Sequence, residues 1–206
     1  MRNTHLILFA KAPARGLAKT RLIPALGVER TAALAARMLH ETLRHAIAAR
    51  LGTVELCVTP AIEDAQWEGI SVPTGIVVTF QGEGDLGARL TRAARRALQC
   101  ERAVLFLGTD CPHLDSTRLC QAAHHLEHAD AVLYPTTDGG YALIGMKQFN
   151  ARVFADIEWS TASVTATTRA RMAELAWSVH LGPTLHDIDE PADLAHLPEH
   201  LTPPPP

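Results

Sequence analysis

The fold is decided by the stretch HLILFAKAPARGLAKTRL, residues 5–22 of the 206-residue chain. Its first six residues are a short apolar run, which predicts a buried strand over residues 5–10. The loop that follows holds four cations and a glycine: Lys11, Arg15, Gly16, Lys19 and Arg21. Such side chains beside free backbone N–H groups suit a diphosphate or triphosphate, and a solvated basic loop is the alternative. A Walker A motif is excluded, because Ala18 stands where that motif needs glycine.

Apolar runs of the same kind recur along the chain and alternate with helical patterns. Further strands are predicted at 53–59, 75–80, 103–107, 131–134, 141–146 and 177–181. Helices are predicted at 28–47, 86–98, 114–126, 163–176 and 191–197, with Asp115 or Ser116 capping the third of them. This alternation indicates an α/β protein with a mainly parallel sheet. We expect one domain over residues 1–200 and a proline-rich tail over 201–206.

The composition and the length of the apolar runs exclude several classes of protein. A hydrophobic share of 47% is typical of a globular protein. The net charge of −3 argues against a general nucleic-acid binder. No apolar run is long enough for a membrane span, and the first residues lack the pattern of a signal peptide. The four cysteines form no C-x-x-C pair. We therefore expect a cytoplasmic protein that binds neither membrane nor nucleic acid, and the oligomeric state stays open.

Carboxylates at the ends of predicted strands suggest a metal site. In an open α/β sheet, ligands bind outside the carboxyl ends of the strands. Asp110 follows the strand at 103–107, and Asp187 and Asp189 share one side of an extended segment. Hard divalent cations prefer such ligands, so these three residues could hold Mg²⁺ or Mn²⁺. Turn or cap roles are the alternative.

Three glycines after the strand at 75–80 permit a different interpretation. Gly82, Gly84 and Gly87 match G-x-G-x-x-G between a predicted strand and a helix, and Asp110 lies 23 residues after Gly87, which is compatible with dinucleotide binding. That fingerprint normally follows the first strand, which here carries the cationic loop instead. A tight turn with Asp85 capping the next helix is the structural alternative.

Asp138-Gly139-Gly140-Tyr141 follows the strand at 131–134. The glycines would let the backbone approach a sugar while Asp138 accepts hydrogen bonds from its hydroxyl groups, although a plain hairpin turn has the same sequence. Trp159 could add a stacking face, or it could be a half-buried structural residue.

The eleven histidines also raise the question of a transition metal. His124 and His128 share a helix face, and His125 lies beside them. No H-E-x-x-H motif supports them, so we interpret them as a solvated helix face.

Taken together, five motifs resemble one bacterial family. They are Lys11-x-Pro13-x-x-Gly16-x-x-Lys19-Thr20-Arg21-Leu22, Gly84-Asp85-Leu86-Gly87-x-Arg89, Gly108-Thr109-Asp110-x-Pro112, Asp138-Gly139-Gly140-Tyr141 and Asp187-Ile188-Asp189. The family has the GT-A, or nucleotide-diphospho-sugar transferase, fold, a three-layer α/β/α domain with a mainly parallel sheet. Its members are described as glycosyltransferases, one branch of which is tied to arsenosugar biosynthesis. A more distant resemblance is to the guanylyltransferases of molybdenum-cofactor and phospholactate metabolism.

The resemblance implies roles for the residues named above. Lys11, Arg15, Gly16, Lys19 and Arg21 would hold the donor phosphates, and Gln81 and Asp85 would lie near the base or ribose. Asp110 would bind metal, and Asp187 or Asp189 would complete that site. Two departures from the family pattern are Thr109-Asp110-Cys111, to which a metal-binding D-x-D motif is reduced, and Glu190, where a threonine is expected after Asp189.

We therefore expect a Mg²⁺- or Mn²⁺-assisted glycosyltransferase that passes a sugar from a nucleotide-diphosphate donor to a small hydroxylated acceptor. Asp110 and Asp138 are the predicted catalytic residues, and Asp138 would position the acceptor or act as general base. Gly139, Gly140, Tyr141 and Trp159 would contact the sugar or acceptor. The alternatives are a nucleotidyltransferase that uses a nucleoside triphosphate and a non-catalytic nucleotide or dinucleotide binder.

Overall fold

The computed structural model of the chain describes residues 4–100 and 103–202. The strands are β1 (Thr4–Lys11), β2 (Val54–Thr59), β3 (Val77–Phe80), β4 (Ala103–Leu107), β5 (Ala131–Pro135), β6 (Tyr141–Met146) and β7 (Val179–Leu181). The α-helices are α1 (Ile23–Leu26), α2 (Val28–Ala49), α3 (Leu86–Ala97), α4 (Ser116–His128) and α5 (Val164–Glu174). Shorter 3-10 helices are η1 (Thr20–Leu22), η2 (Ala65–Trp67), η3 (Ala151–Phe154), η4 (Pro191–His196) and η5 (Glu199–Leu201).

The strands form one seven-stranded sheet in the order β3-β2-β1-β4-β6-β5-β7. Neighbouring strands are parallel except around β6, which runs antiparallel to both β4 and β5. The connection between β5 and β6 is a short turn, which suffices for an antiparallel pair but not for a parallel crossover. The predicted α/β class with a mainly parallel sheet is confirmed.

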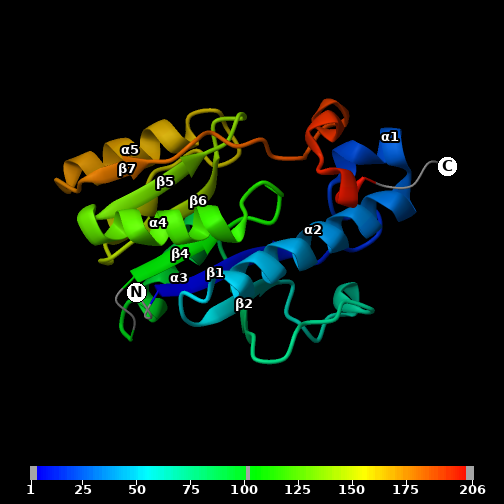
Figure 1. Ribbon diagram of the computed structural model, residues 1–206, viewed down its shortest axis with the longest axis horizontal. Coiled ribbons are helices and arrows are strands. Elements are labelled where there is room, and N and C mark those ends of the chain that lie inside the picture. Colours follow the sequence, from blue (N-terminus) through cyan, green and yellow to red (C-terminus); the bar gives the residue numbers. More distant parts are fainter. Residues whose placement is uncertain (1–3, 101–102, 203–206) are drawn as a thin grey trace.

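Helices cover both faces of this sheet (Figure 1). On one face, the helices α2 and α4 pack against strand residues such as Leu6 and Leu8. On the other face, α3, η3 and α5 pack in a cluster that includes Ile7. Alternate residues of β1 thus point to opposite layers, as expected for a strand buried on both sides.

Aspartates begin the helices α3 and α4. Asp85 accepts a hydrogen bond from the Ala88 N–H, and Asp115 accepts one from the Arg118 N–H. Each carboxylate satisfies a backbone donor that the first helical turn leaves without an intrahelical partner. The structure thus selects Asp115 over Ser116 as the cap of α4.

The end of the chain returns to α2. A third core cluster joins Leu22, Leu34 and Met38 to Ile188 and Leu201. Figure 1 shows the segment after β7 crossing to the end of the molecule where α1 lies. Leu201, which was expected in the proline-rich tail, is 3% exposed because it packs in this cluster. The predicted helix at 191–197 is the 3-10 helix η4, and the prolines at 203–206 lie outside the described residues.

The structure also describes the cysteine thiols and the lengths of the helices. The four cysteines are free thiols, with Cys57 and Cys111 buried and Cys100 and Cys120 exposed. Among the described residues, no helix is long and apolar enough to span a bilayer.

A buried carboxylate ties β2 to β1, β3 and α3. Glu55 is 1% exposed and contacts His5 Nε2 at 3.0 Å and Thr79 Oγ1 at 2.5 Å, and it also accepts from the Arg96 guanidinium. Burial alone would raise the pKa of Glu55, but the contact with His5, the hydrogen bond from Thr79 and the charge of Arg96 outweigh it and hold the pKa below its usual value. The ionised carboxylate is therefore stabilised only while its partners remain.

We expect Arg96→Met to lower the free energy of unfolding by about 2 kcal/mol, because it removes a charged donor from a buried carboxylate. Urea denaturation at neutral pH measures the loss. Arg95→Met is the matched control on the same helix: its guanidinium lies 5.2 Å from the Phe149 ring centroid and should cost less than about 1 kcal/mol. Equal losses in the two variants would contradict the assigned role of Arg96.

Candidate functional site

Loops that carry the predicted site residues meet at one edge of the sheet. The strands β1 and β4 are adjacent and parallel, so the cationic loop after β1 and Asp110 after β4 leave the sheet at the same edge. The turn after β5 reaches this edge too, because β5 and β4 both run opposite to β6. The segment 185–189 joins them through a backbone hydrogen bond from the Ile188 N–H to the Asp110 carbonyl, at 2.9 Å.

Lys19 is the centre of this edge. Its ammonium group lies 2.5 Å from Asp110 Oδ1, 2.7 Å from the Ile188 carbonyl oxygen and 3.1 Å from Asp189 Oδ1. Only 7% of the Lys19 side chain is exposed. The backbone of Lys19 is left-handed, with φ of 47°, which is uncommon for a residue other than glycine. One buried cation thus joins the cationic loop, the end of β4 and the C-terminal segment.

Charge explains why this arrangement is stable. Burial alone would lower the pKa of Lys19, but the charges and hydrogen bonds of Asp110 and Asp189 outweigh it, so the pKa lies above its usual value. For Asp189, burial and the charge of Asp110 raise the pKa, and Lys19 opposes the rise. Burial, followed by the charges of Asp138 and Asp189, also raises the pKa of Asp187. The carboxylates therefore repel one another, and Lys19 compensates only part of that repulsion.

The other predicted phosphate ligands lie along the exposed part of the loop. The Lys11 ammonium donates to the Leu17 carbonyl at 2.9 Å. Arg15 pairs with Glu29 at 2.9 Å, and Arg21 pairs with Glu190 at 3.7 Å; all four side chains are more than 60% exposed. Exposed pairs of this kind contribute little stability. Both arginines are thus available to exchange partners for a ligand.

Gly16, the remaining predicted phosphate ligand, lies in the same exposed loop with φ of +71°. A side chain there would meet no neighbouring atom within 4 Å, so the positive φ rather than close packing favours glycine at this position.

Two cavities lie on either side of the carboxylates. One, of about 260 Å³, is lined by Lys11 and Lys19 of the cationic loop and by Phe9. The other, of about 280 Å³, is lined by residues from the ends of β4, β5 and β6 and from the segment around Trp159. Asp110 and Asp189 line both cavities. The site therefore has a cationic side and an acidic side with a shared boundary.

The turn after β5 presents Asp138 to the acidic cavity. Asp138 Oδ1 accepts hydrogen bonds from Thr136 Oγ1 at 2.5 Å and from the Gly140 N–H at 2.9 Å. Gly139 has φ of +91°, and a Cβ there would lie 2.3 Å from the Ala162 carbonyl oxygen. Glycine is required at this position by both conformation and space.

Tyr141 and Trp159 line the same cavity. The hydroxyl oxygen of Tyr141 is buried, so its ring rather than its hydroxyl group lines the cavity. The same burial raises the pKa of Tyr141. Gly87 permits the close approach of Trp159, because a Cβ at residue 87 would lie 3.0 Å from the indole nitrogen. Gly140 also lines the cavity. The structure therefore brings together Asp110, Asp138, Gly140, Tyr141, Trp159, Asp187 and Asp189.

Gln81 and Asp85, which the resemblance placed near the base or ribose, make contacts within the chain. Gln81 is 5% exposed, and its amide donates to the Ala10 carbonyl at 3.2 Å and to the Cys57 carbonyl at 2.9 Å. Asp85 caps α3 as described above. Neither residue lines the two cavities at the carboxylates.

Arginines of α3 hold the glycine-rich turn at residues 82–84, and sequence reasoning did not assign them this role. Arg89 donates to the Gly84 carbonyl at 2.8 Å, and Arg92 donates to the carbonyls of Gln81 and Glu83. A Cβ at Gly82 would lie 2.5 Å from the Arg92 guanidinium. The sequence hint for this role was that Arg89, Arg92 and Arg96 recur every three or four residues, outside the apolar stripe of the predicted helix. The φ of +78° at residue 82, more than the contact with the flexible Arg92 side chain, accounts for glycine there.

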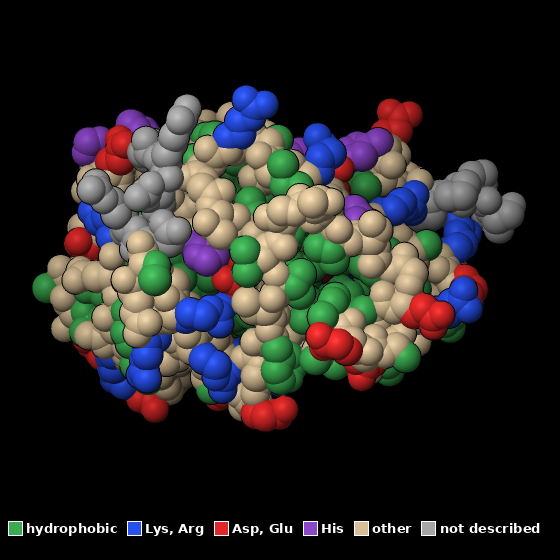
Figure 2. Space-filling model, turned by 90° about the horizontal axis from the view of Figure 1, so that it is seen from below, with side chains coloured by type: hydrophobic (Ala, Val, Ile, Leu, Met, Phe, Trp, Pro, Cys, Tyr) green, Lys and Arg blue, Asp and Glu red, His purple; other side chains and the backbone are tan. Residues whose placement is uncertain are grey.

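A third cavity, of about 600 Å³, lies on the outer side of the cationic loop and was not predicted. Its lining includes Ala32, Ala33 and Ala36 of α2, the loop residue Arg15, and residues 65, 66 and 68–70 of the β2–β3 connection. The view from below shows this side of the molecule hollowed, with hydrophobic side chains inside the hollow (Figure 2). In the sequence, only the small side chains of Ala32, Ala33 and Ala36 could have indicated this cavity.

The donor set of the acidic cavity fits a hard divalent cation. Four carboxylates, those of Asp110, Asp138, Asp187 and Asp189, line it, and no lysine or arginine is among its lining residues. Lys19 contacts two of the four carboxylates. The predicted ligands Asp110, Asp187 and Asp189 do not form a compact group, however: within residues 4–100 and 103–202, only His124, Glu127 and His128 bring three ligand atoms within 4.8 Å of one another.

Comparison with solved structures supports the fold assignment. A protein of Desulfovibrio desulfuricans G20, provisionally assigned as a nucleotide-diphospho-sugar transferase, is 28% identical over 92% of this chain and 84% of that chain, with a TM-score of 0.85. The predicted nucleotide-diphospho-sugar transferase-like fold is thereby confirmed.

More distant structures share the fold alone. CMP:2-keto-3-deoxy-manno-octonic acid synthetase in complex with CTP is 10% identical, with a TM-score of 0.60 over 94% of this chain and 96% of that chain. Rv0371c of Mycobacterium tuberculosis H37Rv in complex with manganese is 15% identical, with a TM-score of 0.54 over 95% and 97% of the two chains.

No curated protein sequence matches the chain. A model of one bacterial family matches residues 42–161, which include Asp110 and Asp138 but neither the cationic loop nor Asp187 and Asp189. Because this match covers more than half of the sequence, the chain belongs to the family described as "uncharacterized protein conserved in bacteria" (DUF2064).

Proposed function

We propose that the protein is a transferase that uses a nucleotide-diphosphate sugar and passes the sugar to a small hydroxylated acceptor. The observation that carries this proposal is the position of Lys19 among carboxylates at the boundary of two cavities. A diphosphate leaving group needs cations where its charge develops, and the acceptor needs a place beside the sugar that is transferred. The relative at 28% identity supports a transferase activity.

The cationic cavity is the proposed site of the donor phosphates. Lys11 and Lys19 line it, and Arg15, Gly16 and Arg21 lie in the same loop. A phosphate group would offer Lys19 an anionic partner in place of Asp110 and Asp189. Arg15 and Arg21 could likewise leave their exposed carboxylate partners at little cost. We also propose that Gln81 and Asp85 lie near the base of the donor. They flank the turn at residues 82–84, which follows β3 at the same edge of the sheet as the cationic loop.

Asp110, Asp187 and Asp189 are the residues that would hold Mg²⁺ or Mn²⁺. Such an ion, when bound, would neutralise negative charge on the diphosphate. The surplus of carboxylates over cations in the acidic cavity supports this assignment. Because Asp110 lines both cavities, it would hold the ion beside the donor phosphates.

The acidic cavity is the proposed site of the sugar and acceptor. Asp138 holds two internal hydrogen bonds on Oδ1 and would use its second carboxylate oxygen to orient the acceptor hydroxyl group or remove its proton. Gly139 and Gly140 keep the turn narrow, and the rings of Tyr141 and Trp159 would pack against a sugar face.

Nucleotidyl transfer from a nucleoside triphosphate is the second candidate function, and the CTP-bound structure that shares the fold favours it. Both reactions would use the same cationic loop and carboxylates. They differ in the leaving group, which is a nucleoside diphosphate in glycosyl transfer and pyrophosphate in nucleotidyl transfer.

Thermal unfolding with GDP, UDP, CDP and dTDP sugars, nucleoside triphosphates and NAD, each with and without Mn²⁺, tests the donor. A donor at about 100 times its Kd should stabilise the fold by about 2.7 kcal/mol, which shifts Tm by several degrees. We expect a shift with one nucleotide-sugar set that requires Mn²⁺ and is lost in Asp110→Asn. A shift with NAD alone would overturn the proposal, and release of pyrophosphate during turnover would select the second candidate.

Lys19→Met should lower turnover on the order of 10²–10³-fold, because it removes a cation from the developing charge of the leaving group. Lys147→Met is the control, since this exposed lysine follows β6 at the opposite edge of the sheet. Steady-state rates of both variants, measured with the donor that shifts Tm, make the comparison. If Lys19→Met turns over at the wild-type rate, the phosphate role assigned to Lys19 is wrong.

Asp138→Asn should keep the turn, because an amide oxygen can accept the same hydrogen bonds from Thr136 and Gly140. Loss of the carboxylate should nevertheless lower kcat by about 10²-fold or more, with donor affinity unchanged. Donor titration and acceptor kinetics on the same preparation separate the two quantities. Unchanged kcat and acceptor KM would remove Asp138 from the proposed mechanism.

A further inference from the structure

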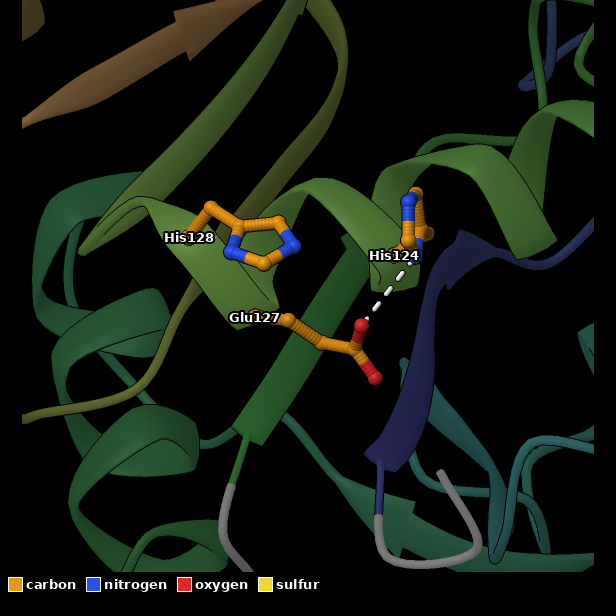
Figure 3. A group of neighbouring side chains, drawn as sticks. All are labelled: His124, Glu127 and His128. Atoms are coloured by element: carbon orange, nitrogen blue, oxygen red, sulfur yellow. Dashed lines mark ion pairs between the residues drawn. The ribbon is translucent and has the colours of Figure 1, made fainter.

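The last turns of α4 carry a compact group of metal-binding side chains far from the carboxylate site. His124, Glu127 and His128 are exposed and project from one side of the helix (Figure 3). Their spacing of three and four residues places them on adjacent turns of the same helix face. The sequence predicts that His124 and His128 share a helix face, and in the structure Glu127 lies beside them.

The geometry of the three side chains suits one cation. A ring nitrogen of each histidine and a carboxylate oxygen of Glu127 all lie within 4.8 Å of one another. His124 Nδ1 and Glu127 Oε2 are already 3.1 Å apart. Two ligands of a tetrahedral zinc ion, each about 2.0–2.2 Å from the metal, are separated by about 3.3–3.6 Å. Exposed side chains can reach that separation by small rotations about their own bonds.

The surroundings of the group favour a cation as well. The three residues lie at the C-terminal end of α4, where the helix dipole is negative. His125 of the same turn stacks on His180 of β7 with ring centroids 3.5 Å apart. The dipole therefore favours a cation at this end of the helix.

We propose that His124, Glu127 and His128 bind one divalent transition-metal ion of the borderline class, such as Zn²⁺, and leave its fourth coordination position open. Two imidazole nitrogens and one carboxylate oxygen are ligands of this class, whereas Mg²⁺ prefers oxygen ligands alone. The site is separate from the carboxylates around Lys19. The helix α4 ends where β5 begins, so the proposed site lies at the opposite edge of the sheet.

Isothermal titration of the untagged full chain with ZnCl₂, in excess Mg²⁺ to occupy the carboxylate site, tests the proposal. We expect one Zn²⁺ per chain in the wild type and affinity at least about tenfold weaker in His124→Ala and in His128→Ala, because each variant loses a direct ligand. Both side chains are exposed, so neither change removes a core contact.

His200→Ala is the matched control. Its side chain is 61% exposed, compared with 60% for His124, and it contacts Glu41 at 3.0 Å in another group of histidine and glutamate. This variant should bind Zn²⁺ as the wild type does. Titration with CoCl₂ should in addition produce visible absorption of tetrahedral Co²⁺ that Zn²⁺ displaces. Wild-type affinity in both α4 variants, or an equal loss in His200→Ala, would overturn the assignment.

Discussion

The bond that the rest of the site depends on is the contact of the Lys19 ammonium with Asp110 and Asp189. These residues are far apart in the chain, and each belongs to a different segment at the edge of the sheet. Without the cation, the carboxylates would repel one another in a partly buried place. The same bond, together with the cluster of Leu22, Ile188 and Leu201, fixes the C-terminal segment across α2. The site and the closure of the fold are therefore one structural unit.

Local patterns were sufficient to predict most of the fold. The apolar runs and the aspartate caps indicated every strand of the sheet and the helices α2 to α5, because burial and capping act within a few neighbouring residues. The position of Asp110 at a strand end followed from the same reasoning. The antiparallel direction of β6 was anticipated only by the hairpin-turn alternative at residues 138–141, since strand direction depends on the tertiary path of the chain as well as on the pattern of side chains.

Contacts between distant residues set the limit of prediction from sequence. Lys19 was recognised as a cation for a ligand, but its carboxylate partners lie 91 and 170 residues away. The contacts of the Gln81 amide with the carbonyls of Ala10 in β1 and Cys57 in β2 were not predicted either. The role of Arg92 against Gly82 likewise depends on packing between a helix and the turn that precedes it. Side-chain partners of this kind are chosen by the folded geometry and leave no periodic signal.

The reversed strand β6 has a consequence for how relatives of this chain can diverge. It allows the turn at residues 136–140 to reach the functional edge without a crossover helix. Substitutions in this turn at positions other than Gly139, where glycine is required, leave the strand order and the loop after β1 unchanged. Evolution can therefore vary the Asp138 side of the cavity while the lysine and its carboxylates are inherited intact.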